Sequence, residues 1–204
     1  MPFFLCGVRK ERIIFGMKDF FEKYSYSSVC LFLNQIAIGI FGMMLALAAG
    51  MTENDALRTG TSIFAILFFL FLQFSSTWKV GAEDKVSVDL GKRKRDLTVP
   101  VKIWLLANSL NLLLALLISL SIWTDVKALD AIGGVATMIK LLVEGMYTGV
   151  LAVHVGGAPL NSYWFMHFLT TIPSLIVIFA SYVCGLKGIN FNGWFSANPN
   201  SRGK

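Results

Sequence analysis

The chain has 204 residues, of which 55% are hydrophobic and only 15% charged, and its formal net charge is +6. A soluble domain is usually about one quarter charged and shows its apolar residues in short periodic stripes, so this composition excludes an ordinary soluble domain. The excess lysine and arginine lies beside apolar stretches and not in a basic folded domain, which argues against nucleic-acid binding.

Four long stretches contain no Asp, Glu, Lys or Arg. They run over 24–52, 59–78, 103–124 and 145–186, and the last is long enough for two crossings. About 20 apolar residues rising 1.5 Å each span the roughly 30 Å hydrocarbon layer of a bilayer. We therefore predict an all-α fold: a polytopic transmembrane helix bundle of four or five spanning helices within residues 29–187.

The first 28 residues are expected to precede the bundle. Residues 8–23 mix apolar and basic side chains, which predicts an interfacial amphipathic helix, with a frayed basic tail as the alternative. A short apolar stretch comes before Arg9, Lys10 and Arg12, the reverse of the order in a signal peptide, so the first crossing is expected to be retained. A polar tail, 188–204, follows the bundle.

The first three crossings are predicted at 29–50, 59–78 and 103–124. The link 51–58 carries two acidic residues and one basic residue, whereas the link 79–102 is rich in lysine and arginine. Basic loops face the cytoplasm, so the N-terminus and the second link are predicted to be cytoplasmic. Within that link we interpret the basic cluster as a topology anchor, with lipid head-group or partner binding as the alternative; it comprises Lys92, Arg93, Lys94 and Arg95.

Two further apolar segments, 134–155 and 164–186, flank a stretch rich in helix breakers, 156–162. Hydropathy favours counting both as crossings, which gives five. The basic residues after 186 favour four crossings, with 134–155 re-entrant or interfacial, because the tail would then be cytoplasmic. We take five as the expectation. Pro173 is expected to kink the last crossing.

Small residues recur every fourth position in two of these segments. Such spacing allows two helix backbones to approach closely in lipid, within one chain or between two chains. The predicted helix-packing residues are Gly42, Ala46, Gly50, Gly145 and Gly149.

Five amides lie inside the predicted crossings at a similar depth, roughly 8–12 Å below the cytoplasmic surface. An amide that faces lipid leaves its polar atoms unpaired at a cost of several kcal/mol, so these side chains are expected to face one another. They form a polar layer that either joins helices or lines a solute site open to the cytoplasm. Its members are Asn34, Gln35, Gln73, Asn108 and Asn111.

Lys140 and Glu144 are four residues apart and can pair on one helical face. A charge pair at membrane depth indicates a functional site, whereas the same pair at the interface is unremarkable. His154 and His167 flank the breaker-rich turn, but two histidines are too few for a metal site. Neither a metal nor another cofactor is predicted, and the three widely spaced cysteines are interpreted as packing residues.

Residues 78–84 (WKVGAED), the run 161–165 with Pro173 beyond it, and the closing Gly185-Leu186-Lys187 together resemble small uncharacterised membrane proteins of Gram-positive bacteria. The resemblance covers most of the chain. It implies a location in the bacterial cytoplasmic membrane and implies neither a function nor a site.

None of the motifs HExxH, GxSxG or GxxxxGK[ST] occurs, so we do not expect an enzyme. The first function predicted is a non-catalytic membrane partner or accessory subunit that acts through helix contacts, with another membrane protein or a second copy as its partner. The second is a small-solute transporter or the membrane-embedded binding subunit of an uptake system. The chain resembles the binding subunits of vitamin uptake systems in size and apolar character, although those use six helices.

Overall fold

The computed structural model describes residues 4–52, 54–92, 95–124 and 126–189, with side chains from Lys18 onward. It confirms the all-helical class, and its elements are α1 (Phe4–Gly50), α2 (Asp55–Asp89), α3 (Val99–Ala107), α4 (Ser109–Trp123), α5 (Lys127–Val143), η1 (Gly145–Tyr147), α6 (Thr148–Leu151), β1 (His154–Val155), β2 (Ala158–Pro159), η2 (Leu160–Ser162), α7 (Met166–Leu169) and α8 (Ile172–Lys187).

Three helical segments are long and apolar enough to cross a bilayer: Lys18–Gly50, Asp55–Asp89 and Met166–Lys187. A fourth crossing is added if the bent pair α3–α4 counts as one span. These segments contain the crossings predicted at 29–50 and 59–78 and most of the one predicted at 164–186, and the bent pair contains most of 103–124. Their apolar side chains face outward over much of their length, as a lipid environment requires.

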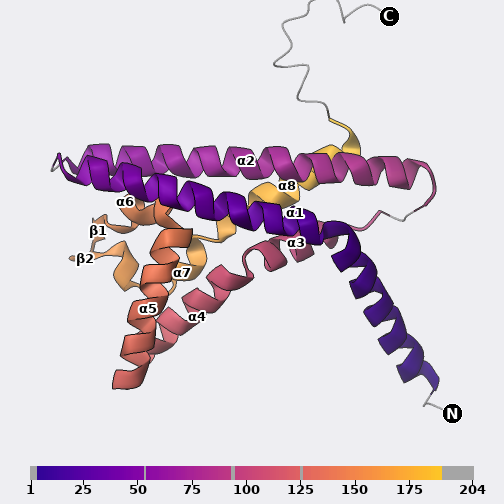
Figure 1. Ribbon diagram of the computed structural model, residues 1–204, viewed down its shortest axis with the longest axis horizontal. Helices are drawn as coiled ribbons and strands as arrows, with labels where there is room; N and C mark the ends of the chain where they lie inside the picture. Colours follow the sequence, from indigo (N-terminus) through magenta and orange to yellow (C-terminus); the bar gives the residue numbers. More distant parts are fainter. Residues whose placement is uncertain (1–3, 53, 93–94, 125, 190–204) are drawn as a thin grey trace, which may run out of the picture.

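The long helices α1, α2 and α8 lie side by side and form the body of the molecule (Figure 1). α1 runs antiparallel to α2, since Lys23 and Tyr24 near the start of the α1 span contact Asp84 near the end of α2. α2 and α8 run parallel, with Gly81 against Tyr182 and Gly185 against Trp78. We call the end of this bundle at which α2 and α8 finish the basic end, because it carries the basic α2–α3 link.

The direction of α8 decides between the two topologies. Trp78 Nε1 donates to the carbonyl of Ile189 at 3.0 Å, so the end of the described chain lies at the basic end. A fifth crossing would require α8 to run antiparallel to α2, and it runs parallel. The expectation of five crossings is therefore not supported, and up to four agree with the structure.

The fourth predicted crossing, 134–155, is not a continuous helix. α5 ends at Val143, Glu144 leaves the helical conformation with φ −115° and ψ 25°, and the chain continues through η1 and α6 into the β1–β2 hairpin. Gly156 and Gly157 turn this hairpin with φ of +66° and +89°, the left-handed conformation that a two-residue turn of this kind needs. The hydropathy of this segment predicts a continuous helix, but its glycines and its charged Glu144 interrupt the helix.

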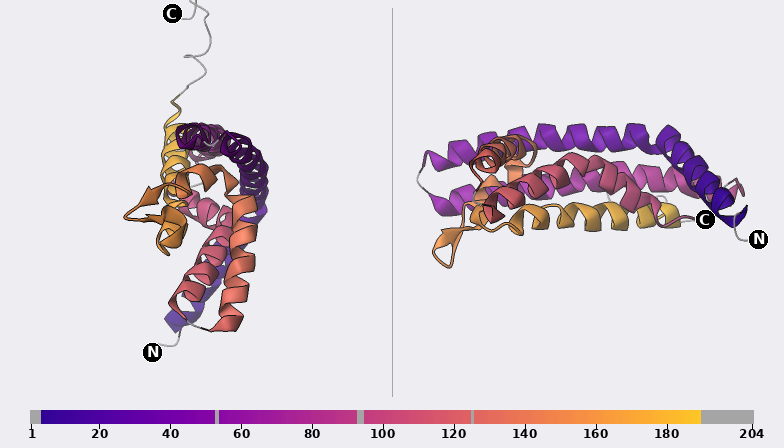
Figure 2. Two further views of the ribbon diagram at one scale, coloured as in Figure 1. Left: turned by 90° about the vertical axis from the view of Figure 1, so that its left-hand side faces the viewer. Right: turned by 90° about the horizontal axis from the view of Figure 1, so that it is seen from below.

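The third predicted crossing is bent by 59° between α3 and α4. Asn108 lies at the break, where its side-chain amide donates to the Trp104 carbonyl at 3.1 Å. Such a local bond competes with the regular helix ladder. α4 then pairs with α5, and the two diverge from the three-helix body (Figures 1 and 2).

Two predicted boundaries also need correction. The predicted N-terminal helix is not a separate element, because α1 is unbroken from Phe4 to Gly50, and its interfacial position stays a prediction. The predicted loop 79–102 is much shorter, since α2 continues to Asp89 and α3 begins at Val99. Pro173 lies in the first turn of α8, where its missing N–H is tolerated, and so starts a helix where a kink was expected.

Candidate functional site

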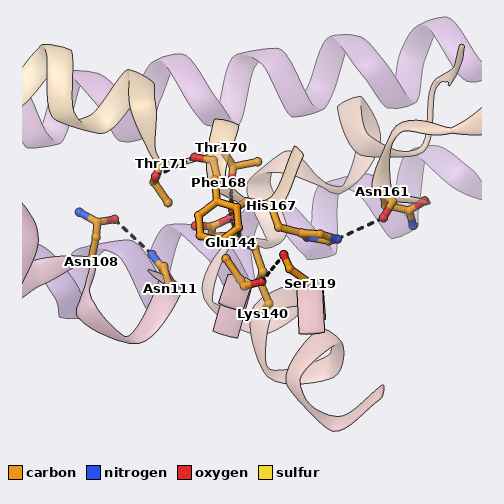
Figure 3. Close-up of polar contacts among 11 residues, drawn as sticks. Asn108, Asn111, Ser119, Lys140, Glu144, Asn161, His167, Phe168, Thr170 and Thr171 are labelled. Carbon is orange, nitrogen blue, oxygen red and sulfur yellow. Dashed lines mark hydrogen bonds and ion pairs between the residues drawn. The ribbon is translucent and has the colours of Figure 1, made fainter. Parts of the chain in front are cut away.

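The predicted pair of Lys140 and Glu144 forms at the place where α5 ends. The ammonium lies 3.4 Å from the carboxylate, and both side chains are at most 5% exposed. Lys140 Nζ also donates to the main-chain carbonyl of His167 at 2.6 Å, and the Thr170 hydroxyl donates to Glu144 Oε2 at 2.8 Å (Figure 3). The pair is therefore buried inside the protein and held by the segment before α8.

His167 completes this group, which we call the Glu144 site: Lys140, Glu144, Asn161, His167 and Thr170. His167 is 5% exposed, and its Nε2 lies 3.1 Å from the carbonyl of Asn161 (Figure 3). Its Nδ1 has no hydrogen-bond partner among the described residues. Two stretches of the chain, 140–144 and 161–170, thus supply one polar group, in which all side chains but that of Asn161 are buried.

Burial sets the protonation behaviour of this site. Removal from water raises the pKa of Glu144, an effect that Lys140 and Thr170 oppose. Removal from water likewise lowers the pKa of Lys140, opposed by Glu144. The hydroxyl of nearby Tyr147 is buried too, which raises its pKa. Each charge of the pair is therefore stable in the protein mainly through the other.

A cavity of about 120 Å³ lies beside the pair. Its apolar wall comes from side chains of α4, α5 and α6, and its polar wall is made by Thr137, Lys140, Glu144, Thr148, Asn161 and His167. An apolar cavity of about 150 Å³ accommodates benzene in a well-studied engineered lysozyme, so this space suits a molecule of that size or a few waters. The walls offer it an acid, a base and an imidazole.

The two histidines of the breaker-rich segment have different surroundings. His154 lies in the exposed β1–β2 hairpin, whereas His167 is buried in the Glu144 site. Among the described residues no group of three or more His, Cys, Asp or Glu side chains could hold a metal ion.

The predicted polar layer is present in part. Gln35, Gln73, Asn108 and Asn111 are all at most 2% exposed, whereas Asn34 is only half-buried. Asn111 donates to the side-chain oxygen of Asn108 at 3.2 Å (Figure 3). No hydrogen bond joins the two glutamines: Gln35 Oε1 and both amide atoms of Gln73 have no partner among the described residues.

The predicted small-residue faces are used within the chain. A Cβ at Gly42 would collide with Met146, one at Gly145 with Gly39, and one at Gly149 with the Arg58 carbonyl. The glycines of 145–149 therefore let η1 and α6 lie against α1 and α2. Ala46 is buried, but Gly50 has open space around it.

A second buried carboxylate, at the basic end, was not among the predicted site residues. Asp84 is 4% exposed and accepts hydrogen bonds from the hydroxyls of Tyr24 at 2.7 Å and Tyr182 at 2.6 Å. Lys23, one third exposed, pairs with its other oxygen. We call these four residues the Asp84 cluster. In the sequence, Asp84 continues the helical face that carries Gln73 and Thr77. The prediction of a loop at 79–102 hides this pattern.

Of the predicted basic cluster, Lys92 and Arg95 are exposed at the basic end. Arg93 and Lys94 lie outside the described residues. A comparison of the chain with protein-family models, curated proteins and solved structures finds no match in any of the three.

Proposed function

We propose that this is a membrane protein that binds a small polar solute in the cavity of the Glu144 site. The observation that carries the proposal is the cavity itself, about 120 Å³ in volume and flanked by the buried side chains of Lys140, Glu144 and His167. Buried charges are expensive in a membrane protein and generally mark a site of function. A pair used only for packing would not need an adjoining space.

The lining indicates the class of solute. Lys140 can donate hydrogen bonds, and Glu144 can accept them. Thr148, whose hydroxyl already donates to the Gly145 carbonyl, can also accept, and His167 can do either. A compact molecule with both donor and acceptor groups, no larger than about six non-hydrogen atoms by comparison with benzene, matches this wall. Zwitterions and small amides belong to that class, and a long-chain lipid does not.

The competing function, a partner protein that acts through helix contacts, stays a prediction. Of the small residues predicted for such contacts, Gly42, Gly145 and Gly149 contact other helices of the same chain. What supports membrane residence is the three apolar helices, four with the bent pair. We further propose a bacterial cytoplasmic membrane with the basic end in the cytoplasm, following the positive-inside rule.

Mass spectrometry of the protein purified in a mild detergent tests the proposal. We expect a small polar molecule that co-purifies with the wild type and is lost from Glu144→Gln and Lys140→Met. Asp130→Asn, which neutralises an exposed acid on the same helix α5, is the matched control and should keep the molecule. Wild-type protein that carries no small molecule, and takes up none from a library of amino acids and amides, would contradict solute binding.

A further inference from the structure

The faces of α2 and α8 that meet are lined with polar side chains between the Glu144 site and the Asp84 cluster. On α2 the buried positions toward the basic end are Gln73, Thr77, Gly81 and Asp84, which recur at helical spacing and so lie on one face. On α8 the corresponding row is Ser174, Ile178, Tyr182 and Gly185. The two rows face each other, because Gly81 lies against Tyr182 and Tyr182 binds Asp84.

The parallel register sets the heights of these residues. A Cβ at Gly81 would meet the Tyr182 carbonyl and the Leu186 amide, and one at Gly185 would meet the Trp78 carbonyl and the Ala82 amide, so Gly81 and Gly185 are level. Ser174 is eleven residues back from Gly185 and Gln73 eight back from Gly81, so Ser174 lies about one helical turn from Gln73, toward the Glu144 site. On the antiparallel helix α1, Gln35 is eleven residues beyond Tyr24, and Gln73 is eleven residues before Asp84, which binds Tyr24, so the two glutamines lie at a similar height.

These side chains are deeply buried, and their polar atoms are not satisfied by the protein. Gln35, Gln73, Thr77 and Ser174 are at most 2% exposed. Gln35 Oε1, both amide atoms of Gln73 and the hydroxyls of Thr77 and Ser174 find no hydrogen-bond partner within the described part of the chain. Buried polar groups in folded proteins are nearly always satisfied, and internal water is the usual partner where protein groups are not.

These buried polar side chains form a file along the α2–α8 interface, and their spacing suits single bridging waters. Thr170, Ser174, Gln73 and Thr77 follow one another at heights three or four residues of helical rise apart, about 4.5–6 Å. Tyr182, whose hydroxyl binds Asp84, lies close to Thr77 in height. Two successive O–H···O hydrogen bonds of about 2.8 Å cover nearly that distance. From Thr170 to Tyr182 the file covers about 18 Å along the axis, more than half of the hydrocarbon layer.

Each end of the file carries a carboxylate, one beside the cavity and the other paired with a partly exposed lysine. At one end Glu144 accepts from Thr170 and is faced by Lys140 and His167, beside the cavity. At the other end Asp84 is faced by Tyr24 and Tyr182 and pairs with Lys23, whose side chain is one third exposed. Each end of the file therefore has a carboxylate that can accept a proton.

From these observations we propose that the α2–α8 interface is a hydrated file that conducts protons between Asp84 and Glu144. In each step an oxygen accepts a proton from one neighbour and releases its own to the next, so that only O–H bonds form and break and one proton crosses in total. Gln73 and Gln35 hold the water in place and do not themselves ionise. The proposal shares Glu144 with the solute site but does not require solute binding.

The test uses the full-length protein in vesicles of phosphatidylcholine and phosphatidylglycerol that contain a pH-sensitive dye. A potassium diffusion potential set by valinomycin drives protons inward. Wild-type vesicles should acidify faster than protein-free vesicles. The double variant Gln73→Leu with Thr77→Val should reduce the protein-dependent rate about tenfold, the factor expected when buried hydrogen bonds are removed from a path. Asp84→Asn and Glu144→Gln should reduce it similarly.

Ser75→Ala and Ser76→Ala are the matched controls, since both serines lie half-buried on α2 beside the file and should leave the rate unchanged. If Gln73→Leu does not fold, Thr77→Val with Ser174→Ala removes two hydroxyls of the file with little change in volume. Proton flux equal to that of empty vesicles, or unchanged flux in a folded file variant, would overturn the proposal. Solute retained by the file variants would show that the solute site stands regardless.

Discussion

Two buried carboxylates, Asp84 and Glu144, lie toward opposite ends of the bundle, and their surroundings differ. Asp84 is bound by side chains of two other helices, with two tyrosine hydroxyls within 2.7 Å and a partly exposed lysine. Glu144 lies where α5 ends, beside a cavity of about 120 Å³, and its charge partner is four residues away on the same segment.

The difference separates a carboxylate that also joins helices from one that lies beside a cavity. The Asp84 cluster joins α1, α2 and α8 through hydrogen bonds that fill the space around the carboxylate. In the Glu144 site, Lys140 and Glu144 lie beside the cavity, and the Nδ1 atom of His167 has no hydrogen-bond partner among the described residues. Saturated polar groups rigidify a bundle, whereas polar groups beside a space can meet a ligand.

The largest expected effect is that of Asp84→Ala on the free energy of unfolding. The substitution leaves two buried hydroxyls and Lys23 without their shared acceptor, which should cost about 3–5 kcal/mol. Denaturant or thermal unfolding in detergent micelles measures the loss. Asp55→Ala, which removes an exposed acid from the same helix, should cost under about 1 kcal/mol. Equal effects of the two variants would remove the structural role of Asp84.

A double-mutant cycle on Lys140 and Glu144 sharpens the comparison. Each of Lys140→Met and Glu144→Gln leaves its partner buried without a counter-charge, so each should destabilise by about 3 kcal/mol, the lower end of the range for broken buried pairs, because the cavity admits water. The double variant should cost less than the sum, with a coupling of about 0.5–3 kcal/mol. Strictly additive effects, read from the same unfolding curves, would mean that the pair does not form.

Close contact of α2 with α8 should be sensitive to a single methyl group. A Cβ at Gly81 would collide with the Tyr182 carbonyl, so Gly81→Ala should destabilise by about 1–3 kcal/mol and disturb the Asp84 cluster beside it. Gly60→Ala is the matched control on the same helix, since nothing lies within 4 Å of its Cβ position. Thermal melting in detergent compares the two, and a neutral Gly81→Ala would contradict the register.

The smallest expected effect is that of Asn111→Leu, about 0.6 kcal/mol, the average for a hydrogen bond between helices in a membrane. Its bond to Asn108 lies at the α3–α4 break, and Asn108 keeps its own bond to the Trp104 carbonyl. Unfolding measurements on Asn111→Leu and on Leu113→Ala, an exposed position of α4, form the comparison. A loss of several kcal/mol for Asn111→Leu would show that this amide does more than join the two helices.

Much of the architecture was predictable because uncharged stretches of this length are stable only as helices in lipid. The apolar spans, the inward position of Gln35, Gln73 and Asn111, and the pairing of Lys140 with Glu144 follow from residue spacing along one helix. Periodicity also indicated that Gly42, Gly145 and Gly149 form contact faces, whereas Gly50, predicted with them, has open space around it. Each of these features depends on neighbours within a few turns, which the order of residues determines directly.

Only the tertiary structure decided the rest. The direction of α8, and with it the loss of the fifth crossing, depends on which helices Gly81 and Gly185 bring together. The same contact buries Asp84, whose position in the sequence looks like a loop, and brings Ser174 within about one helical turn of Gln73. Contacts between residues about a hundred positions apart depend on how all the helices share one interior, and that information is not present in any single segment.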